Sequence, residues 1–276
     1  MLLRQLAYLC LFTSLANPVF AALQIQPIVV FAGSASQPAI EEAVEAFQAE
    51  TGIPVVLHLG GSGAMLSQIQ LSGQGDVYIP GSPDYMEKAI ANGLTAKSPT
   101  IIAYLVPAMI VAEGNPLHIK SLHDLKREEL RIGLADPDGV CVGLYSFEIL
   151  EFNGLLDELR PRLTGMVESC AKAAAMVPLN LVDVVLGWRE FEAWRPEVMD
   201  AIMLKPEELP RLAYIPATVL KKSLYPERAA AFIAYLKSSK GQAIFQKRGY
   251  LTDEKDARRF APYARIGGTY IVPKDK

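Results

Sequence analysis

The sequence has few residues of the kinds that hold metals, and it lacks the patterns typical of nucleic-acid-binding or membrane-spanning chains. Only three histidines and three cysteines occur in 276 residues, and the histidines show no metal-binding spacing. Lysine and arginine form no basic run, so nucleic acid is not an expected partner. After the N-terminal segment, no apolar run reaches the ~18 residues that a membrane-spanning helix requires. We therefore expect no metal site, no cofactor, no nucleic acid and no membrane span.

The N-terminal segment has the pattern of a signal peptide. Arg4 gives it a positive start, residues 6–15 are largely apolar, and Pro18 to Ala21 resembles a small-residue cleavage site. We expect residues 1–21 to be removed near Ala21 and the mature protein to be periplasmic. The formal net charge of the whole sequence is only slightly negative, −3. Such a protein can still bind an anion if local dipoles, rather than net charge, supply the attraction.

The cysteines allow three interpretations. Removal of the signal peptide would take Cys10 away and leave Cys141 and Cys170. An even pair in an exported protein favours a disulfide, which we predict here. Two reduced thiols that pack as small apolar groups, or a thiol pair that binds a soft ligand, are the alternatives. The separation of the two sulfur atoms distinguishes them, because bonded sulfurs lie about 2.05 Å apart.

Apolar strands alternate with amphipathic helices, which predicts an α/β fold. The expected order is strand 27–32, helix 38–51, strand 54–59, helix 63–72, strand 76–79 and helix 83–92. This order predicts parallel strands with right-handed crossovers. A second α/β unit follows, and the chain returns to the first at a strand near residues 211–215. We expect two lobes joined by a hinge, with residues 22–103 plus 213–276 in lobe 1, residues 104–212 in lobe 2 and a ligand cleft between them.

Two loops of small residues each follow a predicted strand and open a predicted helix. One is Gly33 to Ser36, and the other is Gly60 to Ala64. At such a junction backbone N–H groups remain free at the positive end of the helix dipole, and serine hydroxyl groups add further donors. Ligands of open α/β sheets bind at the carboxyl ends of strands, where both loops should lie. Together the loops predict an uncharged cradle for an anion.

Several short motifs, in this order, resemble the periplasmic molybdate/tungstate-type substrate-binding proteins of ABC importers. The motifs, which cover nearly the whole predicted mature chain, are Ala32-Gly33-Ser34, Thr51 to Val55, Gly60 to Ala64, Gly75 to Ile79, Gly114-Asn115-Pro116, Ala135-Asp136-Pro137, Gly143-Leu144-Tyr145 and Phe245 to Tyr250. The resemblance implies two α/β lobes that close on a tetrahedral oxyanion. It also implies delivery of that ligand to a membrane permease.

The resemblance also implies a set of ligand-binding residues. Ser34 and Ser62 match the two hydroxyl donors of the family, and Val142 and Cys170 match positions that donate backbone N–H groups. This sequence departs from the family at two positions: Trp188 stands where a tyrosine is usual, and Cys141 replaces a common proline. Ser36 and Tyr145 complete the candidate set. For Ser36 the favoured alternative is that it caps its helix, and for Tyr145 that it packs in the core.

The sequence therefore predicts an oxyanion receptor of a transport system, acting as a monomer with a small oxyanion and an ABC permease as partners. Two alternatives stay open. One is a receptor for a thiophilic ligand, such as an arsenic, copper or sulfur species, that uses Cys141 and Cys170. The other is an enzyme with Cys141 or Ser62 as its nucleophile, although no histidine lies in a matching motif to act as the base.

Overall fold

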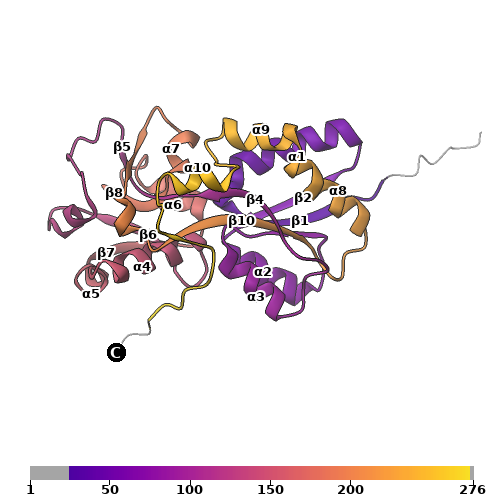
Figure 1. The fold of residues 1–276 in the computed structure, drawn as a ribbon, viewed down its shortest axis with the longest axis horizontal. Coiled ribbons are helices and arrows are strands. Elements are labelled where there is room, and N and C mark those ends of the chain that lie inside the picture. The colour runs from indigo at the N-terminus through magenta and orange to yellow at the C-terminus, as the bar shows by residue number, and fades with distance from the viewer. Residues whose placement is uncertain (1–24, 274–276) are drawn as a thin grey trace, which may run out of the picture.

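The computed structural model describes residues 25–273, which form two α/β lobes side by side along the long axis of the molecule (Figure 1). The predicted signal peptide, residues 1–21, lies outside the described residues. Within residues 25–273 no helix is long and apolar enough to cross a membrane. The two-lobed α/β fold expected from the sequence is confirmed.

The sheet of lobe 1 has a parallel centre with an antiparallel edge. Its strands run in the order β11 (Arg265–Ile266), β10 (Arg211–Val219), β3 (Val77–Ile79), β1 (Ile28–Gly33) and β2 (Val55–Gly60), and β4 (Thr100–Leu105) also pairs with β10. Strand β1 is parallel to both β2 and β3, as the strand–helix alternation predicts. Strand β10 runs antiparallel to β3 and β4 because the chain re-enters lobe 1 from the opposite direction.

Helices cover both faces of this sheet. One face carries α1 (Gln37–Thr51), α8 (Pro226–Lys237) and α9 (Ser239–Lys247), and the other carries α2 (Ser62–Ser72) and α3 (Pro83–Ala91) (Figure 1). In α1 the apolar side chains of Ile40, Val44 and Phe47 recur at helical spacing, and all three are buried. Each such residue stabilises the lobe by about 1.5–3 kcal/mol through the apolar surface it removes from water.

Lobe 2 has its own five-stranded sheet. Its strands lie in the order β7 (Leu163–Val167), β6 (Ile132–Ala135), β8 (Val184–Trp188), β5 (Pro107–Ala112) and β9 (Met199–Met203). Around it lie α4 (Cys141–Phe152), α5 (Leu156–Leu159), α6 (Cys170–Met176), α7 (Glu190–Trp194) and α10 (Glu254–Arg258). Lobe 2 also contains the short 3₁₀ turns η2 (Leu122–Lys126), η3 (Arg160–Arg162) and η4 (Pro206–Glu208). A further turn, η1 (Ser34–Ser36), follows β1 in lobe 1.

The chain passes between the lobes where β4 ends and β5 begins, with buried Val106 between them, and it returns at the start of β10. The lobe bounds given above, 22–103 plus 213–276 and 104–212, remain our proposal. The packing differs from them near the C-terminus. There Ala257, Ala261 and Ala264 pack into the apolar cluster that fills lobe 2, although the sequence assigned them to lobe 1.

Candidate ligand-binding site

Ser34 lies at the end of β1 and is buried at the boundary between the lobes. Its hydroxyl oxygen accepts a hydrogen bond from the backbone N–H of Ala171, at 3.3 Å. Ala171 is the second residue of α6, so this bond joins lobe 1 to lobe 2. A hydroxyl group that accepts one bond still carries its own hydrogen. Ser34 is thus placed to donate to an acceptor between the lobes.

Ser62 occupies the equivalent place after the neighbouring strand, β2. The parallel register pairs Gly33 with Gly60, which brings the two serine loops to the same edge of the sheet. The Ser62 hydroxyl oxygen accepts a hydrogen bond from the backbone N–H of Gly81 at 3.0 Å. The N–H of the next residue, Gly63, donates across the lobe boundary to the Gly139 carbonyl at 2.9 Å. The structure therefore brings the two predicted serine loops together at the face that meets lobe 2.

Cys141 and Cys170 supply the opposite wall, but they do not form the predicted disulfide. Each is the first residue of its helix, α4 or α6, and each is buried. Their sulfur atoms lie 3.4 Å apart, and both cysteines are free. The prediction of a disulfide was wrong for this structure. The sulfur of Cys141 instead reaches over to lobe 1, where a Cβ atom placed on Gly81 would lie only 2.5 Å from it.

The environment of Cys141 keeps its thiol protonated. Burial raises the pKa of the Cys141 thiol well above its ordinary value, and the adjacent Cys170 raises it further. The neighbouring Ser62 hydroxyl and Trp188 indole lower this pKa but do not outweigh burial. The Cys141 thiol is consequently neutral where it faces the serines, as an uncharged anion site requires.

Two aromatic side chains lie behind the thiols. Trp188, the last residue of β8, and Tyr145, in α4, meet edge to face with ring centroids 5.2 Å apart. Both are buried, yet the Trp188 indole nitrogen and the Tyr145 hydroxyl have no hydrogen-bond partner among the described residues. Leaving a buried donor unpaired costs about 1–3 kcal/mol, so such atoms call for an explanation. An occupant between the lobes would provide one.

The remaining two predicted residues contribute less directly. Val142 is the second residue of α4, where a backbone N–H has no partner within the helix. Its carbonyl accepts the Ser146 hydroxyl at 2.7 Å. Ser36 is buried, and its hydroxyl donates to the Gly33 carbonyl at 3.2 Å. The hydrogen of Ser36 is therefore used to hold the first serine loop.

The lobes are in direct contact around this site. Besides the Ala171–Ser34 and Gly63–Gly139 bonds, the hydroxyl of Tyr85 in α3 donates to the Asp138 carbonyl at 3.1 Å. Residues from both lobes shield the two serines and the two cysteines from solvent. The structure therefore represents a closed arrangement, and a ligand could reach the site only after the lobes separate.

A buried charge cluster, which the sequence analysis missed, joins the lobes next to the site. The Arg211 guanidinium group donates to Glu148 of α4 at 2.6 Å and to Asp84 of α3 at 3.1 Å. It also donates to the Gly268 carbonyl at 2.6 Å and lies 4.2 Å from the centroid of the Tyr145 ring. Arg211 is fully buried. No local pattern marks this cluster, because its members lie 63 and 127 residues apart in the chain.

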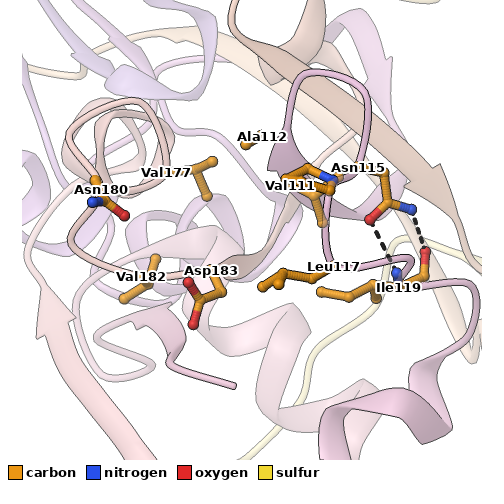
Figure 2. Close-up of a pocket in the computed structure, with 10 residues that line it drawn as sticks. Val111, Ala112, Asn115, Leu117, Ile119, Val177, Asn180, Val182 and Asp183 are labelled. Atoms are coloured by element: carbon orange, nitrogen blue, oxygen red, sulfur yellow. Dashed lines mark hydrogen bonds between the residues drawn. The ribbon is translucent and has the colours of Figure 1, made fainter. Parts of the chain in front are cut away.

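A separate hollow in lobe 2, of about 210 Å³, contains none of the predicted site residues (Figure 2). Its lining is largely apolar, and the amide group of Asn115 is already bonded to the backbone of Ile119, at 2.7 and 3.0 Å. We do not assign it a ligand. Within residues 25–273 there is also no group of three or more histidine, cysteine or acidic side chains that could hold a metal ion.

Residues 28–251 match the family described as bacterial extracellular solute-binding protein. The chain belongs to this family. The molybdate-binding protein ModA of Rhodobacter capsulatus is 24% identical over 252 residues, which are 89% of this chain and 94% of the relative. This confirms the resemblance to molybdate-type binding proteins that the motifs indicated.

Solved structures show the same fold. The periplasmic molybdate-binding protein of Azotobacter vinelandii aligns with a TM-score of 0.70 at 19% identity, covering 82% of this chain and all of that one. The sulfate-binding protein SubI of Mycobacterium tuberculosis aligns with a TM-score of 0.74 at 15% identity, covering 88% of this chain and 92% of that one. At these identities the structures establish the two-lobed fold of the solute-binding protein, and its ligand must be argued from its own residues.

Proposed function

We propose that this solute-binding protein captures a tetrahedral oxyanion, of the molybdate or tungstate type, between its lobes. The observation that carries this is the position of Ser34 and Ser62 at the same sheet edge. There the Ser34 hydroxyl meets the start of α6, and Ser62 lies beside Cys141 at the start of α4. Hydrogen bonds from neutral donors to a charged acceptor stabilise it by about 1.5–3 kcal/mol each. Several such donors hold a dianion without a countercharge that would hinder its release.

In this proposal lobe 1 supplies hydroxyl groups, and lobe 2 supplies the backbone N–H groups of Val142 and Ala171 and the indole N–H of Trp188. The direct bond from Ala171 to Ser34 would give way to bonds from both groups to the ligand. The unpaired Trp188 indole nitrogen would gain an acceptor. The relatives named for molybdate support this ligand class.

We further propose that the protein acts in the periplasm as a monomer and delivers its ligand to an ABC permease. The family supports a role in solute binding, and we propose no catalytic activity. An enzyme would need a base beside Cys141 or Ser62. Among the histidines, His58 stacks on Phe31 with ring centroids 4.8 Å apart.

A thermal-shift screen with molybdate, tungstate, sulfate and phosphate tests the proposal. A ligand present at 100 times its dissociation constant stabilises the folded state by about 2.7 kcal/mol. We expect molybdate or tungstate to raise the melting temperature most. The double variant Ser34→Ala/Ser62→Ala should lose the shift, and the exposed-site variant Ser67→Ala should keep it. Equal shifts in all three proteins would contradict the proposal.

A further inference from the structure

The thiol pair in the proposed site has no role in oxyanion binding that hydroxyl groups or backbone N–H groups could not fill. Both cysteines are buried and unbonded at the point where the lobes meet. The sulfur of Cys141 faces lobe 1 next to Gly81, where any side chain beyond hydrogen would clash with it. Thiols are weak hydrogen-bond donors but strong ligands for soft centres. Two of them side by side indicate a second chemical capability of the site.

The distance between the sulfurs restricts what they could hold together. A linear two-coordinate ion needs its sulfurs about 4.6 Å apart, twice a metal–sulfur bond of about 2.3 Å, whereas two such bonds at nearly a right angle span about 3.3 Å. The observed separation is 3.4 Å. A tetrahedral metal would need two more ligands, and residues 25–273 contain no group of three or more cysteine, histidine or acidic side chains to provide them. The geometry therefore fits a pyramidal centre that needs few protein ligands.

We propose that Cys141 and Cys170 bind a trivalent metalloid hydroxide, of which arsenite, As(OH)₃, is the simplest. This inference rests on the proposed function because it uses the same site between the lobes. Two As–O bonds break and two As–S bonds form, and each departing hydroxide takes the proton of one thiol and leaves as water. Arsenic remains trivalent, and no oxidant or reductant is involved. The product carries one remaining As–OH group.

The surroundings of the thiols suit this product. The Ser62 hydroxyl, which lies close enough to the Cys141 thiol to affect its pKa, is available to the remaining As–OH group. The indole nitrogen of Trp188 lacks a partner among the described residues and could donate to the same oxygen. The condensation takes one proton from each thiol and releases two water molecules. The same neutral donors would thus serve an oxyanion and a metalloid hydroxide.

The test uses the full chain with Cys10→Ser, so that every thiol counted belongs to the pair. The protein is reduced, freed of reductant and titrated separately with arsenite and with molybdate, with melting temperature as the readout. Intact mass and arsenic X-ray absorption then report how arsenic is bound. We expect arsenite to stabilise the protein, to protect both thiols from a chromogenic thiol reagent and to show two As–S contacts.

The single variants Cys141→Ser and Cys170→Ser should each weaken arsenite binding by about 100-fold, because the second bond of a chelate benefits from a high effective concentration. Their melting temperatures without ligand verify that they fold, and Cys170→Ala serves if Cys170→Ser does not. Reversal of the arsenite effect by a small dithiol would further support the proposal.

Three results would overturn the proposal: no thiols in the protein purified without reductant, arsenic bound through oxygen alone, or no response to arsenite in the reduced protein. The two ligands separate this inference from the proposed function. A protein that binds molybdate but not arsenite keeps the function and loses the inference. A protein that binds arsenite but no oxyanion keeps the thiol site and loses the function.

Discussion

The two lobes meet at two neighbouring places that differ in the kind of group they bury. The proposed ligand site contains hydroxyl groups, thiols and an indole, and none of its named residues is an aspartate, glutamate, lysine or arginine. Beside it, Arg211 joins carboxylates from α3 and α4 in a fully buried cluster. The ring of Tyr145 separates the two places, since it lies 4.2 Å from the Arg211 guanidinium group and 5.2 Å from the ring of Trp188.

The difference shows how the protein divides two tasks. The charges of the cluster are compensated within the protein, so Arg211 contributes to the folded, closed structure. The neutral site leaves the charge of a ligand to be met by oriented donors, which release it more easily than a full countercharge would. Changes in the cluster should therefore affect stability most, and changes in the neutral site should affect ligand affinity most.

The largest effect should come from Arg211→Met. Removing one partner of a buried ion pair costs about 3–5 kcal/mol, because the other charge stays buried without compensation. Here Asp84 and Glu148 would both be left, so urea unfolding should show a loss in this range. Arg265→Met is the matched control, since Arg265 is largely exposed and lies 3.7 Å from Glu148. A change of at most about 1 kcal/mol is expected there. Similar losses in the two variants would contradict the role of the cluster.

A second prediction concerns Glu190, which is buried two residues after Trp188. Burial raises the pKa of Glu190 from 4.5 to about 7, although the adjacent Arg189 lowers it in part. The folded state therefore holds a proton that the unfolded state releases between these values, and stability should fall as pH rises from about 4.5 to about 7. The loss is on the order of 3 kcal/mol at most.

Urea unfolding across this pH range measures the effect, with Glu190→Gln as the comparison. The glutamine variant cannot ionise at this position, so its stability should decline less than that of the unchanged protein. Parallel pH curves for the two proteins would show that Glu190 is not the group responsible.

In contrast to the Arg211 cluster, changes in the neutral site should affect ligand affinity most. Ser62→Ala should weaken oxyanion binding by about 1.5–3 kcal/mol, the range for a hydrogen bond to a charged group. It should lower the free energy of unfolding less than Arg211→Met does, by about 1–3 kcal/mol, because the buried Gly81 N–H loses its acceptor. Calorimetric titration with molybdate measures the affinity. Ser67→Ala, an exposed substitution in the same helix, provides the control. Equal affinities of Ser62→Ala and Ser67→Ala would remove Ser62 from the site.

The smallest effect should come from Trp188→Phe, which keeps an aromatic ring and removes the unpaired N–H. If that N–H donates to the ligand, the variant should lose about 0.5–1.5 kcal/mol of affinity. Tyr145→Phe is the companion variant, because the Tyr145 hydroxyl is also unpaired and the Tyr145 ring lies against Arg211. A larger loss for Tyr145→Phe than for Trp188→Phe would reverse our assignment of the two groups.

Local sequence patterns predicted much of the fold and one side of the site. The spacing of Ile40, Val44 and Phe47 marks α1, and the strand–helix alternation predicts the parallel pairing of β1 with β2 and β3. The serine loops follow from the same alternation, because each is a strand–helix junction at one sheet edge.

Features that depend on packing between distant segments were not predictable in this way. Helix α4 begins at Cys141, and no capping side chain before it marks that start in the sequence. Gly143 obscures that start, since glycine disfavours helices, yet a Cβ atom there would lie 2.2 Å from the Ala135 carbonyl oxygen. The disulfide was predicted from an even pair of cysteines, and the contact of Cys141 with lobe 1 gives no signal in the sequence.

The most direct test of the account is a crystal structure with tungstate, in which tungsten is located by its anomalous scattering. We predict one tungsten peak between the lobes, with the tungstate oxygens within hydrogen-bonding distance of the Ser34 and Ser62 hydroxyl groups and the Ala171 N–H. A peak at the Arg211 cluster, or in the apolar hollow of lobe 2, with the two serines unoccupied, would contradict it.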